Sequence, residues 1–223
     1  MLKQTDKIFS IGPLIEQVNS LQFDKRLSIN KPSGSFFGDP WKTLPEFENT
    51  PLGEVLSILG PIGEARLMRL TSAETYTAHG DPDDRYHIAI ITNPYSYIID
   101  LDDSKLYHLP ADGTLWIMDT SKIHVAANFG GRDRIHLNIR LLLPKFDPNK
   151  KHARISIEGG EFDWKQESYI EVMPELNRLI KSHYVTGFDR VNDRELLLNV
   201  VDNSIIEPII KKLKSKGFTV NLS

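Results

Sequence analysis

The chain has 223 residues, of which 26% are charged and 40% hydrophobic, and its formal net charge is −3. This length suits one sizeable core with a small appendage, and the charge gives no general reason to expect nucleic acid or an anionic membrane as partner. The sequence contains no cysteine, which excludes disulfides and zinc–thiolate sites, so a bound metal must have nitrogen and oxygen ligands. No run approaches the roughly 20 apolar residues of a membrane span, and the first residues contain no secretory signal. We therefore expect a cytoplasmic protein.

Residues 1–60 read as a mixed helix and loop segment that packs on the core. Apolar spacing predicts an amphipathic helix around Ile11–Leu21. A second helix is predicted to begin with Thr50 as N-cap and Pro51 in the first turn, and to end at Gly60. Between them, the aromatic and glycine-rich stretch SGSFFGDPW is typical of a loop.

Residues 61–148 have a β pattern. Seven short runs follow one another at spacings of about ten residues, separated by turns rich in Asp, Pro, Gly and Asn. The runs are EARLMRL, RYHIAIIT, SYIIDL, KLYHL, TLWIMD, HVAAN and RIHLNIRLLL. The pattern predicts a mainly β fold with helical additions, whose core is a double-stranded β-helix of the jelly-roll or cupin-like kind.

Residues 149–223 are predicted to form a mostly helical C-terminal extension. From about Glu167 onward, apolar residues recur at steps of three and four, and the closing KKLKSKG suits a helix C-terminus. This extension could serve as a lid or hold a homo-oligomer together through its helices. Nothing in it looks catalytic.

The residues that indicate chemistry all lie in the β part. His79 and Asp81 form a His-x-Asp pair in a polar loop, and His124 follows Asp81 after 42 intervening residues, near the start of a strand. Two histidines and one carboxylate on one face of an octahedron are the ligand set of non-haem Fe(II) oxygenases, which leaves positions open for a co-substrate and O2. Each signal alone is weak, because a strand histidine is more often a buried residue with a satisfied hydrogen bond.

Arg134 strengthens the hypothesis, since it comes ten residues after His124 on the next predicted strand. Its guanidinium could bind the distal carboxylate of 2-oxoglutarate through two charge-assisted hydrogen bonds. Strand alternation places His136, Asn138 and Arg140 on the same face as Arg134. It likewise places four residues of RYHIAII on one face: Arg85, His87, Ala89 and Ile91. An inward arginine and histidine need an anionic partner such as a dicarboxylate, although alternation alone also allows this face to be solvated.

The stretches MRLTSAETYTAHGDPDDRYHIAIITNP and YHLPADGTLWIMDTSKIHVAANFGGRDRIHLNI resemble the aspartyl/asparaginyl β-hydroxylase family of 2-oxoglutarate-dependent oxygenases, including bacterial proline hydroxylases. The resemblance covers residues 64–143, about a third of the chain. It implies that His79 and His124 bind Fe(II), that Arg134 binds 2-oxoglutarate, and that Arg85 and His87 contact the co-substrate or lie beside it. Animal peptide-modifying members lack a carboxylate at the position of Asp81, so its presence favours the small bacterial type.

These observations predict a 2-oxoglutarate-dependent dioxygenase, with Fe(II), 2-oxoglutarate and O2, that hydroxylates an unactivated C–H bond of a small molecule such as an amino acid. The carboxylate of such a substrate needs a second cation, for which Arg66, Arg69, Arg132 and Arg140 are candidates. A peptide or protein substrate would need an open groove instead, which SFFGDPW could line. Two further alternatives remain: a cupin-like metal-binding module without oxygenase activity, and a purely structural β-sandwich.

Overall fold

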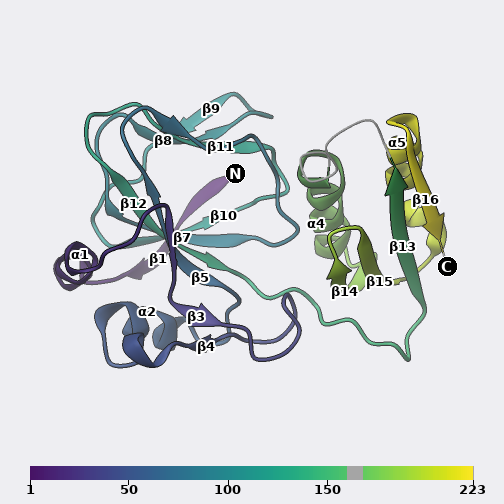
Figure 1. The fold of residues 1–223 in the computed structure, drawn as a ribbon, viewed down its shortest axis with the longest axis horizontal. Coiled ribbons are helices and arrows are strands. Elements are labelled where there is room, and N and C mark those ends of the chain that lie inside the picture. Colours follow the sequence, from purple (N-terminus) through teal and green to yellow (C-terminus); the bar gives the residue numbers. More distant parts are fainter. Residues whose placement is uncertain (160–167, 223) are drawn as a thin grey trace.

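The computed structural model describes residues 1–159 and 168–222, and shows a mainly β protein with antiparallel sheets (Figure 1). A larger unit contains the N-terminal helices, two main sheets and a small sheet of two short strands, and a smaller C-terminal unit lies beside it. Within the described residues, no helix is long and apolar enough to cross a membrane.

The elements of the larger unit are β1 (Leu2–Ile8), α1 (Ile11–Ser20), β2 (Arg26–Ser28), β3 (Asn30–Lys31), β4 (Lys42–Thr43), the 3-10 helix η1 (Pro45–Phe47), α2 (Pro51–Leu59), β5 (Ala65–Leu70), β6 (Glu74–Thr75), β7 (Arg85–Ile91), β8 (Ser96–Asp100), β9 (Lys105–Tyr107), β10 (Thr114–Met118), β11 (His124–Asn128) and β12 (Arg134–Arg140). All seven runs that predicted strands in residues 64–143 are strands. Strand β1 was not predicted, because its sequence LKQTDKI is largely polar and mostly exposed at the edge of its sheet.

Both predicted N-terminal helices are confirmed, with the expected caps on the second. The Thr50 side chain accepts a hydrogen bond from the Gly53 amide at 3.3 Å, and Pro51 occupies the first turn of α2. Gly60 ends the helix with a φ of 77°, a conformation that favours glycine.

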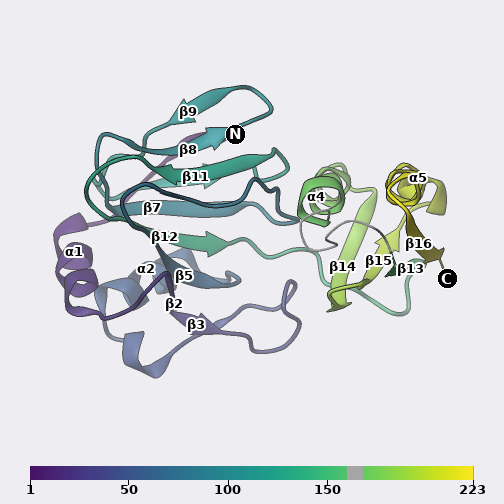
Figure 2. The same cartoon turned by 45° about the horizontal axis from the view of Figure 1, so that its top comes forward.

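The larger unit is built on two antiparallel sheets. The six-stranded sheet has the order β1-β10-β7-β12-β5-β2, and the four-stranded sheet has the order β6-β11-β8-β9. Figure 2 shows β8, β9 and β11 above β7 and β12. Ala89 and Met118 of the large sheet pack with Ile98 of the small one, so this apolar cluster joins the two sheets.

The opposite face of the large sheet is covered by α1 and α2. Leu14 of α1 and Leu52 of α2 share a buried cluster with Ile135, Leu137 and Ile139 of β12. Because side chains alternate along a strand, the polar residues of β12 must point the other way, toward the space between the two sheets. All seven residues of β12 are buried, which excludes the solvated alternative for its polar face.

The C-terminal unit corrects the prediction of a mostly helical extension. It contains β13 (His152–Gly159), the π-helix η2 (Ser168–Val172), α4 (Met173–Lys181), β14 (Val185–Asn192), β15 (Glu195–Val200), the 3-10 helix η3 (Asn203–Ile206), α5 (Glu207–Ser215) and β16 (Phe218–Leu222). Its four strands form one antiparallel sheet of order β14-β15-β13-β16. The run LLLNVV was predicted to be helical but lies mainly in strand β15. Leu196, Leu198 and Val200 are buried at a period of two, and the apolar residues between them conceal this alternation in the sequence.

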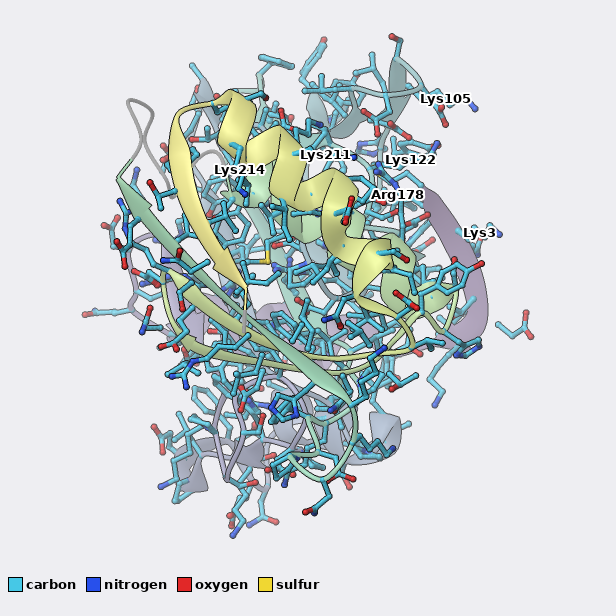
Figure 3. All side chains as sticks on the ribbon, turned by 90° about the vertical axis from the view of Figure 1, so that its right-hand side faces the viewer. Lys3, Lys105, Lys122, Arg178, Lys211 and Lys214 are labelled. Carbon is cyan, nitrogen blue, oxygen red and sulfur yellow. The ribbon has the colours of Figure 1, made fainter. Side chains whose placement is uncertain are left out.

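The two main helices of this unit occupy different places. Helix α4 lies beside the larger unit, and α5 lies farther away, with Lys211 and Lys214 on the side that faces away from the larger unit (Figures 1 and 3). Phe37 and Leu143 of the larger unit belong to the apolar cluster of the C-terminal unit, so the two units share packed side chains.

Candidate metal centre

A cavity of about 590 Å³ opens between the two sheets. Its walls come from every part of the chain: Phe36 and Phe37 from the N-terminal loop, His87 and Asn138 from the large sheet, and Ala126 from the small sheet. Three residues of the C-terminal unit complete the lining, namely Tyr169, Met173 and Arg190.

His79, Asp81 and His124 meet at one side of this cavity. One ligand atom from each residue lies within 4.8 Å of the other two. The Nε2 atoms of His79 and His124 lie 3.7 Å and 3.8 Å from Oδ2 of Asp81. Two imidazole nitrogens and one carboxylate oxygen therefore converge on a single point, as a facial metal site requires.

Backbone carbonyls bind Nδ1 of both imidazoles, which leaves Nε2 of each ring available for a metal. Nδ1 of His79 lies 2.7 Å from the Thr77 carbonyl oxygen, and Nδ1 of His124 lies 2.9 Å from that of Lys122. When Nδ1 carries the proton and donates it to a carbonyl, the lone pair of Nε2 is available for a metal. Burial and the neighbouring His79 lower the pKa of His124 to about 4, so this ring is neutral at neutral pH.

Asp81 leaves one oxygen free in the centre of the group. Its Oδ1 accepts a hydrogen bond from Nη2 of Arg85 at 2.6 Å, while its buried Oδ2 has no hydrogen-bond partner among the described residues. Burial raises the pKa of Asp81, but the Arg85 guanidinium and the two imidazoles outweigh it and hold the pKa below its usual range. A buried, ionised oxygen between two imidazole lone pairs is costly unless a cation completes the group, so these residues fit a divalent metal.

Two chain segments are held together to build this point. His79 and His124 form an isolated antiparallel bridge, in which each amide donates to the carbonyl of the other at 3.1 Å and 2.8 Å. The Asp81 amide donates to the Thr120 carbonyl at 2.9 Å, which ties the loop to the turn before β11.

Arg134 occupies another part of the same cavity. It is 2% exposed, its Nη2 donates to Nδ1 of His136 at 2.9 Å, and no ion pair with a carboxylate is found for it in the described part of the chain. Burial lowers the pKa of Arg134 to about 10, so the guanidinium is still charged at neutral pH. A buried cation without an acidic partner calls for an anionic ligand.

Arg85 and His87 lie between Arg134 and the three candidate metal ligands. In the pairing of β7 with β12, His87 stands opposite Asn138 and Arg85 opposite Arg140. Burial lowers the pKa of His87 well below its usual value, and the charges of Arg134 on one side and Arg85 on the other add to this. The cavity is lined by all eight residues that the sequence predicts as metal ligands, co-substrate contacts or residues beside them. These are His79, Asp81, Arg85, His87, His124, Arg134, His136 and Asn138.

One detail of the predicted alternation is wrong. The register of β7 and β12 shifts between Ile135 and His136, so that Ile91 pairs with Ile135 while Ala89 pairs with His136. This β-bulge turns Ile91 toward the core under α1 and α2, away from the face of Arg85.

The sequence matches a known family model over part of its length. Residues 50–144 match the sequence model of the family described as aspartyl/asparaginyl beta-hydroxylase. This segment is therefore similar to the aspartyl/asparaginyl β-hydroxylase family. A crystal structure of an oxidoreductase of the 2OG-Fe(II) oxygenase family from Burkholderia pseudomallei is similar over 56% of this chain and 76% of that chain, with 12% identity and a TM-score of 0.42. No curated protein matches the sequence.

Within residues 50–144, sequence reasoning missed two residues with buried polar atoms, Asp83 and Tyr76. The carboxylate of Asp83 accepts from Nε of Arg140 at 2.7 Å and lies 4.0 Å from Nε of Arg85. The hydroxyl of Tyr76 is buried and has no hydrogen-bond partner among the described residues. Asp83 lies in HGDPDD, a stretch read as a turn, and Tyr76 lies between two such turns, so neither has a periodic pattern that predicts burial.

The four arginines proposed for a substrate carboxylate divide into two pairs. Arg66 and Arg140 line the cavity, whereas Arg69 and Arg132 do not. Arg69 stacks on the ring of Phe23 at 4.3 Å, and Arg132 is exposed. Arg140 is fully engaged, because its guanidinium also lies 4.6 Å and 4.3 Å from the ring centroids of Phe36 and Phe37.

Proposed function

We propose that the chain is an Fe(II)- and 2-oxoglutarate-dependent dioxygenase that hydroxylates an unactivated C–H bond of an amino acid or amino-acid-like small molecule. The observation that carries this proposal is Arg134, a buried cation without an acidic partner in the cavity that also holds His79, Asp81 and His124. We also propose that the two packed sheets form the double-stranded β-helix, or jelly roll, of such enzymes.

His79, Asp81 and His124 would hold the iron through Nε2, Oδ2 and Nε2. When bound, Fe(II) supplies the activation of O2, coupled to oxidative decarboxylation of 2-oxoglutarate to succinate and CO2, that hydroxylation of a C–H bond needs. The contribution of the protein is to position both substrates and to exclude water.

Arg134 binds the distal carboxylate of 2-oxoglutarate, and His136 orients the guanidinium by accepting from its Nη2. Arg85 holds Oδ1 of Asp81, which leaves Oδ2 directed at the metal. His87 lies between Arg134 and the metal ligands. Its buried Nδ1 has no hydrogen-bond partner in the described residues and can bond the co-substrate.

The charges around the cavity favour an acidic group on the substrate. Six arginines line it against three acids, Glu64, Asp81 and Asp83. Arg66 is the remaining candidate for a substrate carboxylate: its Nη1 donates to Glu64 at 2.8 Å, but its buried Nε has no partner among the described residues. The carboxylate of a free amino acid fits this position.

Release of succinate and CO2 from 2-oxoglutarate, measured with Fe(II) and ascorbate, tests the enzyme class. A panel of free amino acids and peptides then tests the substrate, because the true substrate raises succinate release above the uncoupled background. Stimulation by peptides alone would favour the alternative, a hydroxylase of Asp, Asn or another residue in a peptide or protein. Metal binding without any succinate would favour a non-oxygenase cupin-like module. A cytoplasmic location and self-association through the C-terminal helices remain predictions.

A further inference from the structure

The C-terminal unit touches the loop that carries two of the candidate metal ligands. Residues 145–223 lie outside the segment that matches the family model, and no pattern in their sequence indicates a catalytic role. Two of their described helical elements, η2 and α4, nevertheless contact the segment His79-Gly80-Asp81.

Gly80 is held by the C-terminal unit from two sides. Its amide donates to the Tyr169 carbonyl of η2 at 2.7 Å. A Cβ at this position would lie 2.5 Å from Cγ of Pro174 and 3.1 Å from the Thr120 carbonyl oxygen, so the loop packs against α4 without room for a side chain. A glycine between the two ligands is therefore required by close packing.

Asn177 of α4 makes the most direct contact with a ligand. Its Nδ2 lies 3.2 Å from the backbone oxygen of Asp81, 3.2 Å from Oδ1 of Asp84 and 3.2 Å from Oγ1 of Thr120. The side chain is 2% exposed, so no bulk water replaces these bonds. The Thr120 carbonyl in turn accepts from the Asp81 amide, so Thr120 and Asn177 bind the N–H and the C=O of Asp81.

We propose that Asn177 is a positioning residue for Asp81, so that the C-terminal unit is part of the metal centre. This inference rests on the proposed function, because it assumes that Asp81 binds the metal. Partners of ligand residues set the orientation of the ligand, and the loss of one typically lowers metal affinity about 10- to 100-fold. Asn177 acts on the backbone of Asp81, while Arg85 acts on its carboxylate.

Cobalt(II) binding to the full chain tests the proposal, followed by the d–d absorption band of the metal and by the melting temperature of the metal-free protein. We expect Asn177→Ala to raise the dissociation constant for cobalt by about tenfold or more and to change the band. The matched control is Arg178→Ala, one residue further on α4: Arg178 bonds Glu175 and the Ser121 carbonyl, and its side chain is half exposed (Figure 3). This control should keep the dissociation constant within about twofold.

A second pair of variants covers the case in which Asn177→Ala does not fold. Gly80→Ala should weaken cobalt binding, and Pro174→Ala in the same chain should restore part of the affinity by removing the Cγ at 2.5 Å. The proposal is overturned if Asn177→Ala or Gly80→Ala lowers the melting temperature but binds cobalt as the parent does. A parent chain that binds no metal contradicts the proposed function itself, and the inference with it.

Discussion

His79 and His124 exchange two backbone hydrogen bonds, and their imidazole rings lie 4.4 Å apart between centroids. The bridge joins the loop before β7 to the first residue of β11, so one ligand lies in the loop and the other at a strand end. Each ring donates through Nδ1 to a carbonyl two residues earlier, which directs both Nε2 atoms at Asp81. The two rings are thus held in the same way, and the backbone bridge brings together ligands that are far apart in the sequence. The metal site is therefore preformed.

Removing either imidazole should abolish tight metal binding. His79→Ala and His124→Ala each remove one of three ligands, and we expect at least a 100-fold loss of cobalt affinity, about 3 kcal/mol of binding free energy. His152→Ala is the matched control, because His152 is exposed, does not line the cavity, and donates from its ring to the Lys150 carbonyl. Unchanged cobalt affinity in His124→Ala would rule out the site.

Arg134 should matter for the co-substrate more than for folding. Arg134→Met removes two charge-assisted hydrogen bonds to 2-oxoglutarate, and we expect its affinity to fall about 100-fold, or about 3 kcal/mol. The free energy of unfolding of the metal-free protein should stay the same or rise, because a buried cation without an acidic partner is replaced by an apolar chain. Titration with 2-oxoglutarate and urea unfolding measure the two effects. A large loss of stability with normal 2-oxoglutarate binding would make Arg134 a structural residue.

Much of this arrangement could be predicted from the sequence, and the reasons are local. Turn residues separate the seven core strands, and alternation along β12 correctly places Arg134 and His136 on one face. The bulge at Ile91 could not be predicted, because an extra residue in one strand depends on its partner. The contacts of Tyr169 and Asn177 with the metal loop are also tertiary: they join positions about 90 residues apart, and neither residue type is specific for such a role.

The buried ion pairs of Asp83 with Arg140 and Arg85 should contribute strongly to the free energy of unfolding. Asp83 is buried and faces Arg140 at 2.7 Å and Arg85 at 4.0 Å. Asp83→Ala therefore removes the carboxylate that pairs with the buried Arg140 guanidinium, while Arg85 keeps its pair with Asp81. We expect a loss of about 3 kcal/mol in the free energy of unfolding. Glu175→Ala breaks the half-exposed pair with Arg178 and should cost less than about 1 kcal/mol. Equal losses in urea unfolding would show that the buried Asp83 pairs stabilise the fold no more than a surface pair does.

Stability should fall as the pH is lowered, because buried histidines are neutral in the folded state. Burial lowers the pKa values of His87 and His136 well below the usual 6.5, with Arg134 adding to both shifts. Below about pH 6.5 the unfolded chain binds protons that the folded chain does not, so each ring lowers the free energy of unfolding by up to about 1.4 kcal/mol per pH unit. Urea unfolding of the metal-free protein between pH 7.5 and 5 measures the slope. His136→Gln should reduce it, and an unchanged slope would contradict the neutral state of His136.

Arg66 should control coupling to the substrate without affecting the co-substrate. Once a substrate is found, Arg66→Ala should lose most of the stimulation of succinate release but keep the uncoupled background. Arg69 lies on the same strand but does not line the cavity, so Arg69→Ala should show the same stimulation of succinate release as the parent. Full stimulation in Arg66→Ala would place the substrate carboxylate elsewhere.

Succinate formation from 2-oxoglutarate, measured in the parent chain and in His124→Ala with Fe(II) and O2, tests the central claim most directly. The account predicts iron-dependent succinate from the parent, none above the reagent blank from His124→Ala, and parental amounts from His152→Ala. Equal succinate from the parent and from His124→Ala, or none from the iron-loaded parent, would contradict it.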